Sequence, residues 1–167
     1  MLWNCSRRHR IFLPSNFSWY SKNPFFTSSA WMSLKSQSGE LETLQQGQFL
    51  FKHIRIGGKR KVTQVTLIYT ASINGWRAED FHRFCNQRGP TLCLIRSSEN
   101  HLAAAFTSIS WSSEDVHVED SSAMVFALSN ELQMYETNNP ELAVSHFRRS
   151  GPWFNQALAL WGLPMMN

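Results

Sequence analysis

Residues 67–92 read LIYTASINGWRAEDFHRFCNQRGPTL, and this stretch decides the fold. Its first residues end a run over 62–70 that is rich in β-branched and aromatic side chains. Such a run is too short for a typical isolated helix and predicts a buried strand. Asn74-Gly75 follows, and this dipeptide is a turn signal. The chain is therefore expected to leave a strand and turn sharply.

A helix is predicted directly after that turn, over residues 77–86. Four residues share the spacing i, i+3, i+4, i+7, which places them on one helical face: Ala78, Phe81, His82 and Cys85. Asp80 falls in the first helical turn, where a carboxylate interacts favourably with free N–H groups. Gly89-Pro90 ends the helix.

Outward from this centre, the pattern is that of strands. Residues 91–95 and 102–109 are apolar runs joined around Ser98-Glu99-Asn100, which predicts a hairpin, and 123–128 is a further strand candidate. Between them lies a polar loop that we expect to be exposed; it holds Ser112, Ser113, Glu114, Asp115, Glu119 and Asp120. Upstream, 41–54 has apolar residues at loosely helical or strand-like spacing. The predicted class is α+β, a two-layer antiparallel β-sandwich with flanking helices.

Length, composition and charge exclude several classes of protein. The 167 residues suit one domain, and 43% hydrophobic residues supply enough apolar area for a core. The net charge of +4 is mildly basic, without the dense charge or motif of a nucleic-acid binder. No apolar run approaches the length of a membrane span. Three cysteines without a CxxC pair favour a reducing compartment, so we expect a cytoplasmic protein without metal or cofactor.

In order and spacing, the central stretch resembles the TLDc domain family. That family has a strand, an Asp-Gly-aromatic turn, a Ser-Ala-x-x-Phe-His-x-x-Cys helix and Gly-Pro-Thr-Leu. The matching positions are Gly75, Trp76, Ala78, Phe81, His82, Cys85, Gly89, Pro90 and Thr91. The resemblance continues through Ile95-Arg96-Ser97, Phe106-Thr107 and Trp111-Ser112 to the 122–128 strand.

The sequence departs from the family pattern in three places. Asn74 and Arg77 stand where Asp and Ser are usual, which should weaken the turn and the cap by about 1 kcal/mol. Ala103-Ala104-Ala105 replaces a pair of glycines beside an aromatic residue. Gly151-Pro152-Trp153-Phe154 resembles a late family segment, but the closing strands expected afterwards are absent from 155–167. Residues 41–167 are therefore interpreted as a partial TLDc-like domain.

The resemblance implies a non-catalytic interaction module linked to protection against oxidative stress. In some family members it also implies binding to the vacuolar proton-pumping ATPase, so subunits of that enzyme are the expected protein partner. No catalytic residue is transferred, because the motif marks none. The motif describes a fold in which glycine permits the turn and the helix face docks on a sheet.

Two alternative functions remain open. His82 and Cys85 lie three residues apart, close enough for the thiol–imidazole pair of a hydrolase or thiol peroxidase. Cys93 is a second candidate nucleophile, because it alternates with Leu92 and Leu94 and could be more exposed than Cys85. The ordinary interpretation is a buried thiol beside a hydrogen-bonded core histidine. The other alternative is a degenerate fragment that does not fold alone.

Several other features carry no specific function. The basic run 52–61 contains Gly57-Gly58-Lys59 but lacks the spacing of a phosphate loop. It could contact an acidic partner or lipid headgroups, but a solvated turn between two elements is the more ordinary explanation. The acidic loop does not follow a calcium pattern. Trp111, Trp153 and Trp161 could anchor an interface, although most aromatics in such a chain belong to the core.

The first forty residues differ from the rest of the chain. They contain Arg, Lys, Ser and aromatic residues, and the first acidic residue is Glu40. Mitochondrial targeting segments share this bias, but Pro14 and Pro24 interrupt any helix. The other interpretation is a disordered extension over 1–40, or a start codon placed too early.

Overall fold

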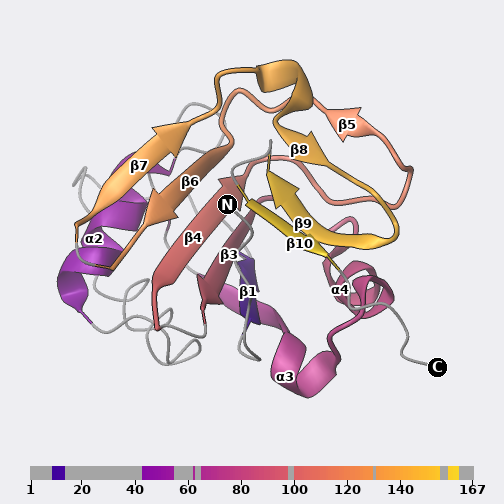
Figure 1. Ribbon diagram of the computed structural model, residues 1–167, viewed down its shortest axis with the longest axis horizontal. Coiled ribbons are helices and arrows are strands. Elements are labelled where there is room, and N and C mark those ends of the chain that lie inside the picture. Colours follow the sequence, from indigo (N-terminus) through magenta and orange to yellow (C-terminus); the bar gives the residue numbers. More distant parts are fainter. Residues whose placement is uncertain are drawn as a thin grey trace.

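A six-stranded antiparallel sheet forms the centre of the protein in the computed structural model, which describes residues 9–13, 43–54, 62, 65–97, 100–129, 131–154 and 158–161. Its strands lie in the order β2-β1-β3-β4-β6-β7 (Figure 1). Their bounds are β1 His9–Leu13, β2 Thr66–Thr70, β3 Thr91–Arg96, β4 Leu102–Thr107, β6 Met124–Ala127 and β7 Gln133–Glu136. Every neighbouring pair is antiparallel.

A second antiparallel sheet has four strands in the order β10-β9-β8-β5. These strands are β5 His117–Val118, β8 Val144–Ser145, β9 Ser150–Phe154 and β10 Leu158–Trp161. The helical elements are α2 Leu44–His53, α3 Ala71–Asn74, α4 Ala78–Cys85 and the 3-10 turn η1 Pro140–Leu142. The expected α+β class with two antiparallel sheets and flanking helices is confirmed. No helix among the described residues is long and apolar enough to cross a membrane.

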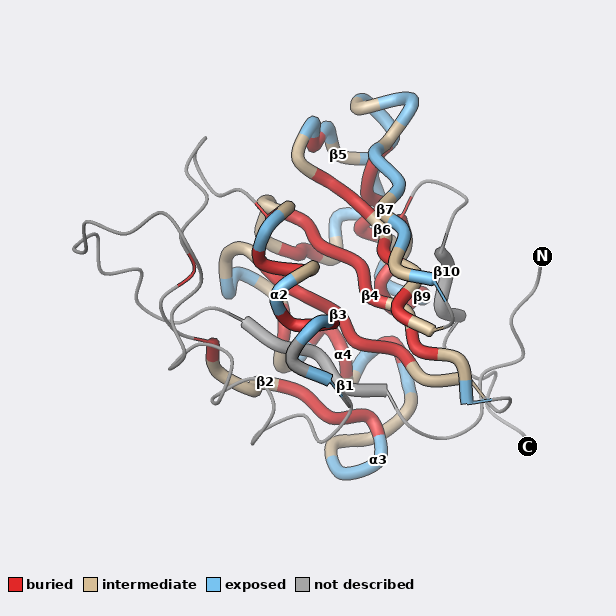
Figure 2. Tube along the Cα trace, turned by 90° about the vertical axis from the view of Figure 1, so that its left-hand side faces the viewer, coloured by how far each residue is buried: buried red, intermediate tan, exposed pale blue. Residues whose placement is uncertain are grey.

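Both faces of the central sheet are covered, and strand alternation sends side chains to two different cores. On β3, Leu92 and Leu94 enter a core shared with Leu50 and Phe51 of α2. The intervening Cys93 enters the other core, which α4 and the second sheet close. Figure 2 accordingly shows β3 and β4 buried along most of their length.

Two hydrogen bonds between Thr43 and Gln46 hold the first turn of α2. The hydroxyl of Thr43 accepts the main-chain N–H of Gln46, and the Gln46 side chain accepts that of Thr43, a reciprocal capping box. The Gln46 amide also donates to the carbonyl of Leu128 at 2.9 Å. That bond ties α2 to the chain just after β6.

Most elements predicted from the sequence are present. The helix predicted over 77–86 is α4, the hairpin predicted over 91–109 is β3 and β4, and the strand predicted over 123–128 is β6. The strand predicted over 62–70 is shorter, because β2 begins at Thr66. The sequence did not predict α3, η1, β5, β7 and β8, which are all four residues or fewer, or the five-residue strands β1 and β9.

Three predictions need correction. The 112–120 loop is not wholly exposed, since Ser112 and Asp120 are buried and β5 lies within it. Cys93 is not more exposed than Cys85, because a second layer covers the face of β3 to which it points. Residues 155–167 do contain a strand, β10, which pairs with β9.

The N-terminal stretch contributes one strand. β1 lies between β2 and β3 in the central sheet, so its five residues belong to the ordered fold. The rest of 1–40 lies outside the described residues, and its interpretation as an extension or targeting segment stays a prediction. Residues 55–61 of the basic run also lie outside them.

Candidate functional site

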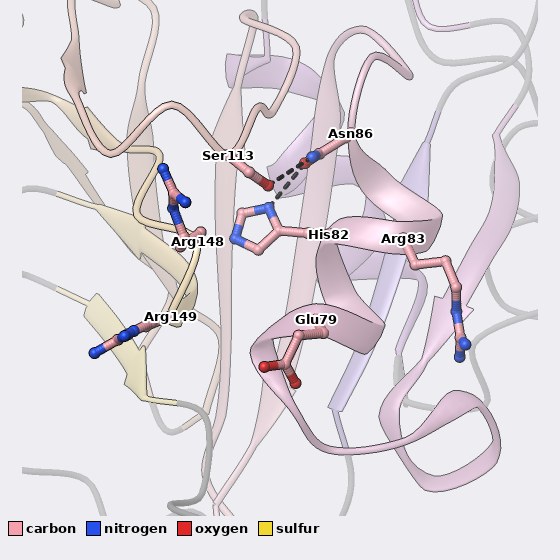
Figure 3. Close-up of a pocket in the computed structure, with 7 residues that line it drawn as sticks. All are labelled: Glu79, His82, Arg83, Asn86, Ser113, Arg148 and Arg149. Atoms are coloured by element: carbon pink, nitrogen blue, oxygen red, sulfur yellow. Dashed lines mark hydrogen bonds between the residues drawn. The ribbon is translucent and has the colours of Figure 1, made fainter.

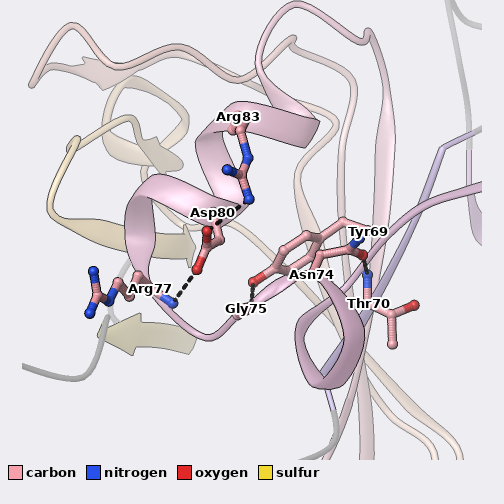
Figure 4. Close-up of polar contacts among 7 residues, drawn as sticks. All are labelled: Tyr69, Thr70, Asn74, Gly75, Arg77, Asp80 and Arg83. Atoms are coloured by element: carbon pink, nitrogen blue, oxygen red, sulfur yellow. Dashed lines mark hydrogen bonds and ion pairs between the residues drawn. The ribbon is translucent and has the colours of Figure 1, made fainter.

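The turn before α4 depends on a glycine. Gly75 has φ +113°, a backbone conformation that residues with a Cβ rarely adopt. A Cβ at this position would lie 2.0 Å from Oδ2 of Asp80, so the carboxylate occupies the space that any side chain would need. The Tyr69 hydroxyl donates to the Gly75 carbonyl at 2.7 Å and holds the turn against β2 (Figure 4).

Asp80 caps the start of α4 from its first turn. Its carboxylate accepts the Arg77 main-chain N–H at 3.3 Å and pairs with the Arg83 guanidinium at 3.0 Å. The Arg77 side chain contains no hydrogen-bond acceptor, so it cannot accept a main-chain N–H of the first helical turn, and only Asp80 contributes a side-chain cap. Asn74 is better suited to its place, because its side-chain oxygen accepts the Thr70 N–H at 2.7 Å.

The predicted stripe of α4 faces inward. Ala78, Phe81, His82 and Cys85 are all buried, as the helical spacing predicted. The Phe81 ring packs edge-on against Tyr69 and Trp111, with centroids 5.9 and 5.2 Å away. The stripe therefore joins α4 to the central sheet and to the second core.

His82 fastens α4 to the turn between β8 and β9. It is 6% exposed, and its Nε2 lies 3.0 Å from the carbonyl oxygens of Phe147 and Ser150. Since carbonyls only accept, Nε2 carries a proton and donates to both. Its Nδ1 lies 2.8 Å from Oδ1 of Asn86, and Nδ2 of Asn86 donates to the Ser113 hydroxyl at 2.8 Å.

The two described cysteines sit in an apolar environment. Cys85 and Cys93 both have an exposed fraction of 0% and belong to the second core. Burial raises the pKa of both thiols far above the usual range, and in Cys85 the neighbouring Cys93 adds to the effect. The ring nitrogens of His82 bond to Asn86, Phe147 and Ser150, and these bonds leave no thiol–imidazole pair with Cys85 among the described contacts. Cys5 lies outside the described residues.

The end of the motif is hydrogen-bonded to the segment that follows β4. Gly89 has φ +82°, and its N–H donates to the Ser110 hydroxyl at 2.9 Å. The Trp111 indole is 0% exposed and donates to the Thr91 hydroxyl at 2.8 Å. Trp111 is thus a core residue and not an interface anchor. Trp153 is half-buried against Phe147, and the Trp161 side chain lies outside the described part.

A second buried histidine, His146 on the chain after β8, lies in the same region. It is 2% exposed, and its ring centroid lies 5.2 Å from that of Trp111. Its Nδ1 shares a hydrogen bond with the Ser112 hydroxyl. Its Nε2 has no described hydrogen-bond partner. Burial, followed by the proximity of His82, lowers the pKa of His146. The neutral ring is therefore the form that the fold accommodates.

A polar pocket of about 400 Å³ lies where one side of α4, including the edge of its buried stripe at His82, meets two loops (Figure 3). Its helical wall repeats the spacing i, i+3, i+4, i+7, and the opposite wall comes from the loop before β5 and the turn between β8 and β9. The lining residues are Glu79, His82, Arg83, Asn86, Ser113, Arg148 and Arg149. The sequence reading missed this pocket, because its walls lie far apart in the chain.

Electrostatics hold one side of the pocket in place. Asp115 accepts the main-chain N–H of Arg148 at 2.8 Å and pairs with its Nε at 2.6 Å. These contacts, the main-chain bond first, lower the pKa of Asp115. Within the described ranges, no group of three or more His, Cys, Asp or Glu side chains is arranged to hold a metal ion.

Comparison with known proteins shows to which family the chain belongs. The model of the TLDc domain family matches residues 35–154, which is well over half of the chain. The chain belongs to the TLDc domain family. A comparison with curated proteins gave no match.

Proposed function

We propose that this chain is a non-catalytic protein-binding module of TLDc type. One observation carries the proposal: the residues that define the motif are used for architecture. Gly75 shapes a turn, Phe81 and Cys85 fill the core, and His82 bonds two main-chain carbonyls. Side chains engaged in this way have little capacity left for a substrate.

The proposed role is protection against oxidative stress in the cytoplasm, with subunits of the vacuolar proton-pumping ATPase as the partner. Support for this role comes from membership of the TLDc family. Fold and family define a role less sharply than a site does, so the partner needs a direct test.

A cysteine-dependent enzyme is the weaker candidate. A catalytic thiol needs solvent access and a lowered pKa, because the thiolate is the nucleophile. Cys85 and Cys93 have the opposite properties, being fully buried with raised pKa values. A degenerate fragment is a third candidate, and a cooperative thermal transition of the purified chain would exclude it.

The binding test uses the purified chain and purified vacuolar proton-ATPase from the same organism. A chain with a cooperative thermal transition should bind the enzyme saturably, and an unrelated domain of equal size should not. If the folded chain does not bind at concentrations up to tens of micromolar, the partner assignment is wrong.

A cellular test separates the module from the enzyme. Cells that lack the chain are challenged with hydrogen peroxide after they receive wild type, Cys85→Ala or Cys93→Ala. A binding module should protect equally in all three forms, provided that each variant is folded and equally abundant. Loss of protection in a folded cysteine variant would favour thiol chemistry.

A further inference from the structure

The strand β7 forms one edge of the central sheet, on the side away from α3 and α4 (Figure 1). It pairs with β6 on one side and, among the described strands, with none on the other. Alternate residues of an edge strand direct their N–H and C=O groups away from the neighbouring strand, where an added strand can bind them. Proline, lysine and β-bulges usually protect such an edge, and β7 contains none of them.

The segment of the chain that contains β7 is acidic. Between Arg96 and Arg148 lie eight of the twelve acidic residues of the chain and no lysine or arginine. Glu131 and Glu136 are exposed, and within the described part of the chain neither forms an ion pair. Their negative charge is therefore uncompensated. It opposes the pairing of two β7 edges and favours a partner strand that carries positive charge.

The two faces of β7 present different side chains. Met134 packs against the core that includes α2, and alternation places Glu136 on the same face. Tyr135 lies on the opposite face and is 53% exposed. Its hydroxyl donates to the Gln133 side chain, and the Gln133 amide donates to the Glu131 carboxylate at 3.1 Å. A strand beside β7 would thus meet a carboxylate on one face and a polar chain with an aromatic ring on the other.

We propose that β7 binds an extended, basic segment of the partner protein, which joins the central sheet as an additional strand. The main chain of the segment bonds to the open edge of β7, its lysine or arginine side chains pair with Glu131 and Glu136, and an apolar side chain packs on Tyr135. The inference rests on the proposed function as a protein-binding module. It assigns the surface of the module and the chemistry of the segment that binds there.

The first test maps peptide binding to the isotope-labelled full chain by NMR. The probe is a peptide of Lys-Val repeats with blocked ends. One counterpart replaces every lysine by glutamate. A second carries a methyl group on every peptide nitrogen, so it keeps the positive charge but cannot donate main-chain hydrogen bonds.

Strand addition has a signature that simple attraction of charge lacks. We expect the Lys-Val peptide to shift the amides of residues 131–136 and, at saturation, to slow the hydrogen exchange of alternate amides of β7 several-fold. Its affinity should fall as salt is raised. Neither counterpart should slow this exchange.

Charge variants then test the two carboxylates. The double variant Glu131→Gln/Glu136→Gln should weaken the Lys-Val peptide about fivefold, through the loss of two opposite-charge contacts at a partly solvated edge. Glu79→Gln removes the same charge from α4, outside the acidic segment, and should change the affinity by less than about twofold. All proteins are compared after thermal unfolding has shown equal stability.

Several results would overturn the proposal. They are unshifted amides of residues 131–136 at millimolar peptide, equal binding of the methylated peptide, or equal weakening by Glu79→Gln and the double variant. A dimer of the free chain with residues 131–136 in its interface would also overturn it, because the edge would then serve a second copy.

The double variant also separates this inference from the proposed function when it is measured against the purified proton-ATPase. Weaker binding by the variant than by wild type supports the assignment of the β7 edge. Equal binding by the two proteins would reject this edge alone, whereas no binding by either would reject the partner.

Discussion

Replacing His82 by alanine tests whether a motif histidine serves the architecture. The substitution removes the Nε2–H donor that lies 3.0 Å from two main-chain carbonyls, one of Phe147 and one of Ser150. Leaving buried carbonyls without a donor costs roughly 1–3 kcal/mol, and the space vacated by the ring adds about 1 kcal/mol. We therefore expect His82→Ala to lower the free energy of unfolding by about 2–4 kcal/mol.

Two matched variants sharpen this experiment. His82→Gln keeps a side-chain N–H and should recover about half of the loss. His117→Ala removes an exposed histidine that bonds only to the Ser145 hydroxyl among the described hydrogen bonds, and should cost less than about 1 kcal/mol. The assay is urea unfolding followed by tryptophan fluorescence, with unchanged slope as the two-state check. A loss below about 0.5 kcal/mol for His82→Ala would refute the reasoning.

Three further predictions follow from single positions. Gly75→Ala should destabilise by about 2–3 kcal/mol in thermal unfolding, because φ is +113° and the new Cβ would strike Asp80. Gly89→Ala, with a positive φ but no atom within 4 Å of a Cβ, should cost about half as much, and equal losses would contradict the steric account. The pKa of His146 is lower in the folded chain than in the unfolded chain, so below about pH 6.5 the unfolded chain takes up a proton at this side chain more readily. The free energy of unfolding should therefore decline as pH falls below about 6.5, and His146→Phe should flatten that decline. Asp120→Asn should cost about 2–3 kcal/mol in urea unfolding, because the buried carboxylate accepts four hydrogen bonds and an amide replaces one acceptor with a donor; a loss within error of zero would contradict this.

Local patterns predicted the centre of the fold well. The stripe of α4 could be read from the sequence because helical periodicity places Phe81 and Cys85 on the same face whatever they pack against. The β3–β4 hairpin was readable for a similar reason, since two apolar runs flank a short polar link. These features depend on neighbours close in sequence.

Features that depend on distant contacts could not be predicted. Strand alternation showed that Cys93 points to the opposite face of β3 from Leu92 and Leu94, and that face was expected to be more exposed. The face is buried because the second sheet covers it, and β9 of that sheet lies more than fifty residues later in the chain. Asp120 looked like a solvated loop residue, yet it accepts hydrogen bonds from Thr107 and Ser108 at the end of β4. The pocket joins α4 to Arg148 and Arg149, and no local pattern links these segments.

Thiol accessibility is the most direct measure of whether the motif serves structure or chemistry. In a Cys5→Ser background, the native chain is treated with iodoacetamide at neutral pH, and Cys85 and Cys93 are followed separately by peptide mass. The structure predicts that both thiols stay protected and react only when the chain unfolds in urea, because both are fully buried with raised pKa values. Rapid, complete labelling of Cys85 in the folded protein would contradict the account.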